Sequence, residues 1–450
     1  MFLLLMMVLM VTPALAEEAG EAKTPQGIET SLDTVWVLIA AALVFFMQAG
    51  FFFLEGGLTR AKNVSNAMLK GAMDFCLGAL IFWAVGFALM FGADRGGFLG
   101  TGGFFANMAD PQWNGLPLYV FLFFQIAFAG AAATILAGGI AERFKFGAYC
   151  IATVTITGLI YPVVGHWIWA EGGWLYRLGM LDFAGSTVVH TVGGICALVG
   201  AWMVGPRAGK YDPDGTPRAI PGHNIPMAAL GTFILWLGWY GFNPGSTLKA
   251  SPAIATVAMT TTLAASAGGA VAMFLTWARY GKPDVSMSMN GILAGLVAVT
   301  AGCAYVSMVS AFAIGLVAGV LVVFAVEFVD RRLRVDDPVG AVSVHAVNGI
   351  WGTIAVGLFA QASYGEANGV AAVNGLFFGG GVAQLGKQLL GIVSVSAWVA
   401  VTATLMFLAL KKTVGIRVSE ESQRVGLDVS EHNLEAYPDF QPAVAEKGGM

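Results

Sequence analysis

Charged residues are scarce in this sequence of 450 residues: Asp, Glu, Lys and Arg make up 11% of the chain, against about a quarter in an ordinary soluble domain. The net charge is −4, so there is no excess of Lys and Arg to bind the phosphates of nucleic acid. Apolar residues make up 57% of the chain, and the mean hydropathy is +0.75. This composition excludes a soluble protein and predicts a polytopic membrane protein.

Cysteine is also rare. Cys76, Cys150, Cys196 and Cys303 all lie in apolar stretches and lack the paired spacing of a metal site. They therefore predict neither a zinc site nor a disulfide framework, and no cofactor is expected.

Residues 1–16 form an uncharged apolar stretch that ends in Ala-Leu-Ala and is followed by Glu17 and Glu18. The stretch is too short to span a bilayer comfortably and ends in a small-residue cleavage pattern. It predicts a signal peptide, although the usual basic start is missing; an uncleaved extra helix is the alternative.

Long uncharged runs fill the rest of the chain. A helix needs about 20 apolar residues to cross the membrane. The run 285–326 is twice that length and breaks near residues 302–307, which predicts two spans, whereas the run 367–386 holds six glycines and predicts a loop. The eleven predicted transmembrane helices lie in 34–54, 75–93, 111–141, 146–170, 183–206, 219–248, 250–278, 285–326 (two), 338–365 and 388–410. Residues 17–410 form the predicted all-α membrane domain, and residues 411–450 form a tail.

Basic residues test this count, because Lys and Arg collect on the cytoplasmic side of a membrane protein. With the mature N-terminus outside, 18 of the 23 basic residues fall in inside segments. The five outside are Lys23, Arg95, Arg177, Lys249 and Lys387. The bias predicts a cell (inner) membrane protein with its N-terminus outside and its C-terminus in the cytoplasm.

An internal repeat surrounds two histidines. The segment Asp182–Ile195 aligns without a gap on Asp337–Ile350, and seven of the fourteen positions are identical, including His190 and His345. Five spans separate the copies, an odd number, so one copy enters from each side of the membrane. The sequence therefore predicts an inverted repeat of five plus five helices, with one extra helix at the end.

The repeat also predicts where the histidines meet. Each lies eight residues beyond its aspartate, which is about 12 Å along a helix, so the imidazoles of His190 and His345 should meet near the midplane. Asp182 and Asp337 stand where a helix N-cap belongs, and capping is the simpler interpretation of both; Asp182 also faces the outer side, where a cation would enter. Paired histidines at this depth indicate a pore. His166, in contrast, is explained by an interfacial aromatic belt.

Several long motifs resemble the Amt/MEP/Rh ammonium transporters, on the bacterial Amt side. They cover nearly the whole chain after the first sixteen residues, and they occur in the family's order. The motifs are Leu181–Gly185 with Val189-His190, Gly238–Ser246, Arg334–Pro338 with His345, Gly415–Val418 and Gly426–His432. The resemblance implies a homotrimer with the ammonium transporter fold and one narrow pore in each subunit.

The resemblance also implies roles for individual residues. One register is open, because the stretch from Trp169 to Asp182 is one residue longer than in some relatives, which leaves Trp167 as an alternative to Trp169. The implied roles are the twin pore histidines for His190 and His345, the gate of the outer mouth for Phe128 and Phe242, and ammonium binding for Phe124, Trp169, Ser246 and Asp182.

These residue types suit ammonium. Aromatic faces attract a small cation by about 0.5–2 kcal/mol, and the Ser246 hydroxyl can accept an N–H bond that potassium cannot donate. A dry pore makes a bare cation costly to move and neutral ammonia easy to move. The expected mechanism is deprotonation at the mouth, passage of ammonia, and separate proton transfer along His190 and His345.

For the tail, the resemblance implies packing against the cytoplasmic face of the neighbouring subunit, with Arg331, Arg332 and Arg334 as charge partners. It also implies coupling of the three pores and a docking surface for a P-II signal protein. Alternating apolar residues and two glycines, Gly415 and Gly426, indicate an ordered segment rather than a solvated one.

The sequence supports three alternative functions less well. An ammonium sensor on the same fold usually carries an appended signalling domain, whereas only about 40 residues follow the last span. A passive gas channel of the Rh type would not need the outer aromatic site. An enzyme is not expected, because two histidines supply neither a zinc site nor a nucleophile triad.

Overall fold

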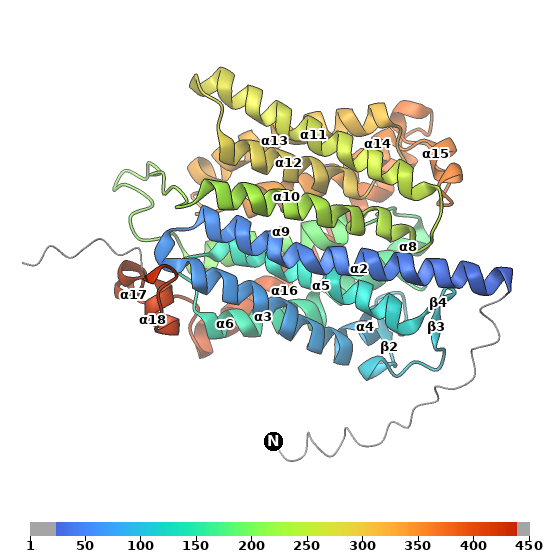
Figure 1. The fold of residues 1–450 in the computed structure, drawn as a ribbon, viewed down its shortest axis with the longest axis horizontal. Helices are drawn as coiled ribbons and strands as arrows, with labels where there is room; N and C mark the ends of the chain where they lie inside the picture. The colour runs from blue at the N-terminus through green and yellow to red at the C-terminus, as the bar shows by residue number, and fades with distance from the viewer. Residues whose placement is uncertain (1–23, 439–450) are drawn as a thin grey trace, which may run out of the picture.

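The computed structural model describes residues 24–438, so the predicted signal peptide at 1–16 lies outside the described residues. Long helices run side by side between the two ends of the molecule (Figure 1). Within the described residues, ten helices are long and apolar enough to cross a membrane, and an eleventh apolar helix, Val285–Thr300, is shorter. The predicted all-α fold with eleven spans is thereby confirmed.

The first half of the chain supplies five spans, several of them built from α-helical and π-helical pieces. Its helices are α2 (Pro25–Leu58), η3 (Ala61–Asn63), α3 (Val64–Ile81), η4 (Phe82–Gly86), α4 (Phe87–Phe91), η5 (Phe104–Ala106), α5 (Leu118–Ile140), α6 (Phe146–Thr155), η6 (Ile156–Ile160), α7 (Tyr161–Trp169), α8 (Trp174–Leu178), η7 (Ser186–Thr191) and α9 (Val192–Val204). Two small antiparallel hairpins join them, β1 (Ala93–Arg95) with β2 (Leu99–Thr101) and β3 (Gln112–Trp113) with β4 (Leu116–Pro117).

The second half supplies five more spans, and one further helix follows. These helices are α10 (Ile225–Phe242), η8 (Pro244–Thr247), α11 (Ala253–Tyr280), α12 (Val285–Thr300), α13 (Met308–Phe328), η9 (Val329–Leu333), η10 (Val342–Val347), α14 (Asn348–Phe359), α15 (Ala362–Ala367), η11 (Leu376–Phe378), α16 (Ala383–Thr413), α17 (Glu420–Val425) and α18 (Leu427–His432). As predicted, the long run 285–326 forms two helices, α12 and α13, with a turn between them.

Polar side chains fix where several spans begin. Thr24, Asn224, Asp284 and Ser307 each precede a span, and each accepts a hydrogen bond from a backbone N–H of its first turn. Such caps satisfy donors that have no partner inside the helix. The spans therefore start at residues the sequence marks as capping residues.

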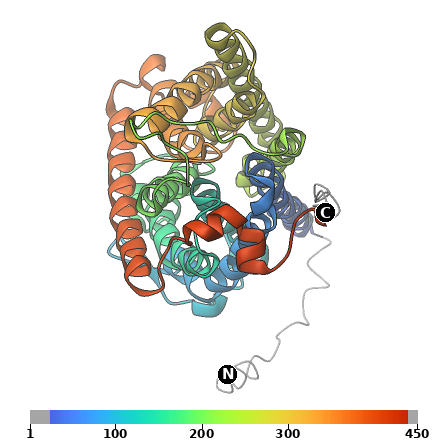
Figure 2. The ribbon, with the colours of Figure 1, turned by 90° about the vertical axis from the view of Figure 1, so that its left-hand side faces the viewer.

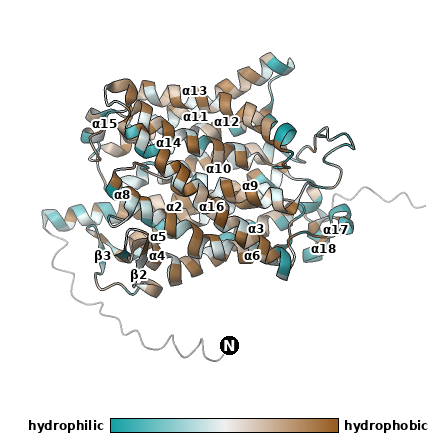
Figure 3. Cartoon of the chain, turned by 180° about the vertical axis from the view of Figure 1, so that it is seen from behind, coloured by the Kyte–Doolittle hydropathy of each residue, from teal (hydrophilic) through white to brown (hydrophobic). Residues whose placement is uncertain are grey.

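The two ends of the bundle differ. We call the end that carries the β-hairpins and α8 the outer end, and the end that carries α17 and α18 the inner end (Figure 1). Apolar residues predominate in the middle of the bundle, and polar residues gather toward its ends (Figure 3). Figure 2 looks onto the inner end, where the red tail lies across the ends of the blue and teal helices.

The two halves meet through equivalent glycines. Gly194 and Gly349 occupy the same position in the repeat. A Cβ on Gly194 would lie 2.2 Å from the backbone nitrogen of Ala346, and a Cβ on Gly349 would lie 2.5 Å from the backbone oxygen of Ser186. Only glycine allows this close approach. It brings the segments that carry the two histidines into direct contact.

Candidate functional site

The two repeat histidines meet in the centre of the bundle, as the repeat predicts. His190 Nδ1 lies 3.2 Å from His345 Nδ1, and the rings lie nearly parallel, with centroids 5.2 Å apart. Both side chains are buried, with exposed fractions of 1% for His190 and 5% for His345. The structure therefore forms a pair of hydrogen-bonded imidazoles away from solvent.

Each histidine sits in a π-helical turn. His190 lies in η7 and His345 in η10, and the α-helix continues after each turn as α9 or α14. Single π turns inside helices are frequent at functional sites, because they change the direction of side chains locally. The same irregularity thus occurs at equivalent positions of both repeats, and it aims both imidazoles at the interface between the halves.

The two repeat aspartates cap these turns. The carboxylate of Asp182 accepts four backbone N–H bonds, from Gly185, Ser186, Thr187 and Val188, at 2.8–2.9 Å. The carboxylate of Asp337 accepts three, at 2.8–3.1 Å. Both aspartates therefore have the structural role that the capping interpretation predicts.

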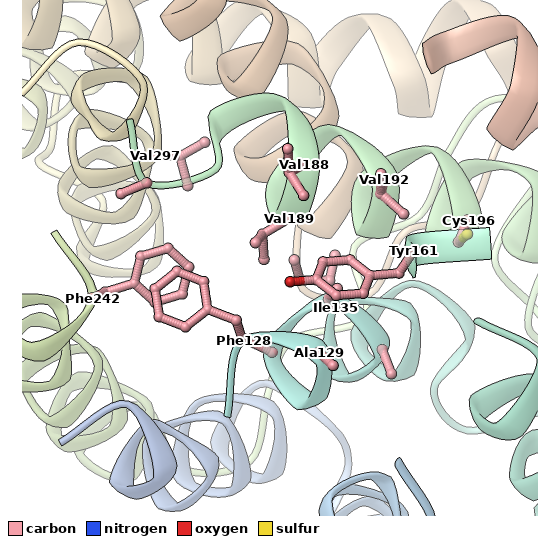
Figure 4. Close-up of a cluster of buried hydrophobic side chains, with 14 of the residues drawn as sticks. Phe128, Ala129, Ile135, Tyr161, Val188, Val189, Val192, Cys196, Phe242 and Val297 are labelled. Atoms are coloured by element: carbon pink, nitrogen blue, oxygen red, sulfur yellow. The ribbon is translucent and has the colours of Figure 1, made fainter. Parts of the chain in front are cut away.

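Two stacked phenylalanines lie outside the histidine pair. The rings of Phe128 on α5 and Phe242 on α10 are 4.0 Å apart and nearly parallel, and they face each other across the interface of the two halves (Figure 4). The Phe242 ring also lies 5.5 Å from the His190 ring. The side chain of Val189 on η7 lies near this stack (Figure 4). The predicted gate residues thus stack on each other next to the imidazole pair, on the side that faces the outer end.

Beyond the gate, the structure forms a cavity of about 150 Å³ at the outer end, which we call the outer vestibule. Three predicted residues line it, Phe124, Trp169 and Ser246, together with Phe128 of the gate. The Ser246 hydroxyl donates to the backbone oxygen of Phe242 at 2.8 Å, so its oxygen keeps lone pairs free to accept. The lining residues that sequence reasoning missed are Phe91, Trp113, Asn114, Phe121, Gln125, Phe183 and Leu248.

Asp182 is not among the residues that line the outer vestibule. Its backbone oxygen instead accepts the Trp169 indole N–H at 2.7 Å, while its carboxylate caps η7. Asp182 therefore orients a vestibule residue and a pore turn, and the structure gives it no direct contact with the cavity.

The geometry distinguishes Trp169 from Trp167. Trp167 is 4% exposed, donates its indole N–H to the backbone oxygen of Phe98 at 2.8 Å, and packs against Trp174 and Trp398. It is a packing residue away from the outer vestibule. Of the two tryptophans, Trp169 lines the outer vestibule, and its role in binding ammonium stays a prediction.

His166 is not a belt residue as expected from sequence. It is fully buried, and its two ring nitrogens lie 2.8 Å from the Met90 backbone oxygen and 2.9 Å from the Asp94 carboxylate. The hydrogen bond from His166 lowers the pKa of Asp94. His166 thus ties α7 to α4 and to β1, a contact between distant residues that spacing along the chain does not reveal.

A buried ion network anchors the second repeat at the inner end. Asp336 accepts hydrogen bonds from the guanidinium of Arg207 at 2.9 Å, and Arg207 also bonds Glu142 at 3.1 Å. Burial raises the pKa of Asp336, but Arg143 and Arg207 outweigh this effect and lower it to about 2. Asp336 is therefore ionised, and it fixes the chain immediately before Asp337.

The tail contacts its own chain. The Lys62 ammonium donates to the backbone oxygens of Gln423 and Arg424 at 2.7 and 2.6 Å, and Asp428 accepts the backbone N–H groups of Ser65 and Asn66, where α3 begins. Among the described residues, the tail also bonds the start of α6 at Lys145 and Phe146, Val204 at the end of α9, and Ala208 after it. These contacts lie within one chain, and the packing of the tail against a neighbouring subunit stays a prediction.

Known proteins match this chain throughout. The model of the Ammonium Transporter Family matches residues 35–437. The chain belongs to this family. Ammonium transporter Amt2 of Archaeoglobus fulgidus is 47% identical over 97% of this chain and 94% of its own length. Ammonium transporter 1 member 3 of Solanum lycopersicum is 38% identical over 91% and 94%.

Solved structures agree with this assignment. A structure titled Sensor Amt Protein has a TM-score of 0.85 and 42% identity, and the match covers 90% of this chain and all of the other. Mep2 of Candida albicans has a TM-score of 0.82 and 31% identity, over 94% and 95% of the two chains. This member of the ammonium transporter family is thus a multi-pass membrane protein, and the expectation of a transporter rather than an enzyme is confirmed.

Proposed function

We propose that this transporter recruits ammonium at the outer vestibule, deprotonates it, and conducts ammonia and the proton by separate steps. Three groups of side chains that lie in sequence from the outer end to the centre of the bundle support this proposal. An aromatic cavity with an accepting hydroxyl comes first, then a stacked phenylalanine gate, and then a buried pair of imidazoles.

Recruitment rests on the lining of the outer vestibule. Phe124 and Trp169 present aromatic faces, which attract a cation by about 0.5–2 kcal/mol each, depending on desolvation. The free lone pairs of Ser246 accept one N–H of ammonium. Asp182 acts through Trp169 and η7, as a positioning residue rather than a ligand. Together these groups favour a cation that donates hydrogen bonds over one that does not.

Passage beyond the gate favours the neutral species. Phe128 and Phe242 are buried and close the way with two hydrocarbon faces, so a cation passing between them loses its water shell and gains no carboxylate. Neutral ammonia loses far less solvation on the same path. Deprotonation at the gate therefore precedes passage.

The proton follows the imidazole pair. A hydrogen bond between the two Nδ1 atoms requires one of them to carry the proton and the other to accept it. When one ring takes a proton from the outer side, the shared proton can shift and the other ring can release one toward the inner side. Imidazole suits such a relay, because its ordinary pKa is near neutrality.

We also propose a membrane location and an oligomeric state for this protein. We expect the inner end to be cytoplasmic in the cell (inner) membrane, as the positive-inside bias indicates, and three chains to form a homotrimer with one pore each. The tail at residues 411–450 then regulates transport from the cytoplasmic face, which also offers a surface to a P-II signal protein. The docking of the tail on Lys62 and the start of α3 supports a regulatory contact made within each subunit.

Proteoliposomes on a solid-supported membrane test this function. Pulses of ammonium at increasing concentration should evoke saturating currents, whereas potassium pulses of equal concentration should evoke none. Equal currents from both cations would reject the recruitment of ammonium by aromatic faces and a hydroxyl. No response to either cation would reject electrogenic transport.

A second function, ammonium sensing, is favoured by one observation. The structure titled Sensor Amt Protein is matched over its whole length. A sensor would bind ammonium at the vestibule without sustained flux. Saturable binding to the purified protein without current in proteoliposomes would therefore favour the sensor.

A further inference from the structure

A second cavity lies on the inner side of the histidine pair. Its volume is about 10 Å³, close to the smallest space that holds one water molecule. Among the residues that line it, two are titratable, His345 and Glu55 of α2. We call this space the inner cavity. The relay proposed above ends at His345 and does not use Glu55.

Glu55 is buried in the last turn of the membrane-spanning helix α2, with an exposed fraction of 4%. Its carboxylate lies beside Gly138 of α5 and interacts electrostatically with Lys70 and Asp74 of α3. Ionisable groups buried in membrane-spanning helices are costly and mark ion or proton pathways by default. A buried carboxylate in this position therefore requires an explanation beyond packing.

The neighbours of Glu55 are themselves fixed. The Lys70 ammonium is 1% exposed and donates to the backbone oxygen of Phe144 at 3.0 Å. Asp74 is fully buried and accepts hydrogen bonds from Tyr149 and from Thr153. Lys70 interacts electrostatically with Glu431 of the tail as well as with Glu55 and Asp74. Of the two buried carboxylates, Asp74 is held by hydroxyl groups, whereas Glu55 lines the inner cavity.

The other polar residue of the inner cavity cannot compete with Glu55 for a proton. Asn290 lines the same space, and its amide group donates to the backbone oxygen of Val339 at 3.2 Å. An amide is not basic enough to take a proton from an imidazolium. Among the residues that line the inner cavity, Glu55 is thus the one carboxylate that shares this space with His345.

We propose that Glu55 accepts the proton from His345 on the inner side of the pore and returns it to ammonia. This inference deepens the proposed function and rests on it. In the first step an N–H bond of the His345 imidazolium breaks and an O–H bond forms on Glu55, through a water in the inner cavity. In the second, that O–H bond breaks as ammonia leaving the pore takes the proton and becomes ammonium. Lys70 and Asp74 are positioning residues.

The test compares Glu55→Gln with a matched control, Glu327→Gln. Glu327 is a carboxylate of α13 that pairs with Arg279 at 3.0 Å, and it does not line the inner cavity. Each protein is reconstituted in proteoliposomes with a pH-sensitive dye in the lumen. Current and luminal pH are then recorded together after a pulse of ammonium.

For Glu55→Gln we expect a current about 100-fold below that of the unchanged protein, because the proton has lost its acceptor. Ammonia still passes and takes a proton from the lumen, so the lumen should become alkaline. Glu55→Asp, which restores a carboxylate, should recover part of the current. Glu327→Gln should behave like the unchanged protein in both signals.

Two results would overturn the role of Glu55. One is a current from Glu55→Gln equal to that of the unchanged protein. The other is loss of current together with loss of luminal alkalinisation in a correctly assembled Glu55→Gln protein, because that pattern indicates a blocked pore rather than a missing proton acceptor. If the unchanged protein itself gives no current, the proposed function fails, and this result is distinct from both.

Discussion

The two halves of the membrane domain repeat the same backbone arrangement, but the cavities on the two sides of the histidine pair differ. Each half carries an aspartate cap, a π-helical turn and a buried histidine at equivalent positions. Residues of both halves line an aromatic vestibule of about 150 Å³ on the outer side of the histidine pair and an inner cavity of about 10 Å³ that holds the carboxylate of Glu55. In the mechanism that we propose, this symmetric scaffold separates recognition of the cation at one end from release of the proton at the other.

The residue before each capping aspartate shows the same contrast. In the first half it is Leu181, whose backbone N–H bonds the Gln388 side chain at 2.8 Å. In the second half it is Asp336, held by two arginines. The inner entry of the repeat is therefore anchored by buried charge, whereas the outer entry is anchored by an amide.

The largest effect should come from removing either histidine. His190→Ala and His345→Ala should each lower ammonium-driven current by about 100-fold or more, because a dry pore offers the proton no other carrier. The proteins should remain assembled, as checked by size-exclusion chromatography. Unchanged current in either variant would mean that the two halves do not share one relay.

Asp336→Asn should lower the free energy of unfolding, because it removes one partner of the buried ion network that is found in the second half. Removing one partner of a buried ion pair costs about 3 kcal/mol in the free energy of unfolding. Because the pKa of Asp336 is lowered to about 2, its contribution is present above about pH 4 and is lost as the pH falls toward 2. Thermal unfolding in detergent at several pH values measures this.

In the Asp336→Asn protein, the part of the loss of thermal stability between pH 4 and pH 2 that comes from Asp336 should be absent. Asp110→Asn, at an exposed position of the outer end, is the control and should leave the profile unchanged. A variant as stable as the unchanged protein at pH 7 would show that the ion network does not anchor the second repeat.

Substitutions of the two neighbouring tryptophans test which of them binds ammonium in the outer vestibule. Trp169→Leu should raise the half-saturating ammonium concentration by about 10-fold, since one cation–π contact is lost. Trp167→Leu should leave half-saturation unchanged and lower stability instead, because Trp167 packs against Trp174 and Trp398. Currents over an ammonium series measure the first effect, and the opposite pattern would exchange the two roles.

A smaller effect is expected from the tail. Truncation after Lys412 should lower transport by about 5-fold, although no pore residue changes, because the inner loops lose a docked regulator. Gly415→Glu should act in the same direction, since Gly415 has φ +73° and a Cβ there would lie 3.0 Å from the Lys145 ammonium. Full activity from a correctly inserted truncated protein would show the tail to be dispensable.

Much of this arrangement was predictable from the sequence. Uncharged runs predicted the spans, and a repeat of fourteen residues predicted that His190 and His345 meet. Capping was predictable as well, because an aspartate three residues before free N–H groups has one common role. These features depend on local patterns or on symmetry, which a single sequence records.

Other contacts were not predictable, because they join residues far apart in the chain. His166 bonds Asp94 across 72 positions, and Lys62 bonds the tail across 361. Glu55 could have been noticed as a carboxylate at the end of an apolar run, but nothing in its neighbourhood along the chain places it beside His345. Such residues need the packed structure before their chemistry becomes visible.

The central claim is that ammonia and the proton cross by separate steps but in equal number. It is tested most directly by recording current and luminal pH together in proteoliposomes of the unchanged protein after an ammonium pulse. We predict an inward current with no more alkalinisation of the lumen than in protein-free liposomes, into which ammonia diffuses through the lipid. Alkalinisation beyond that of protein-free liposomes, without current, would contradict the claim, because it would mean that the protein passes ammonia alone.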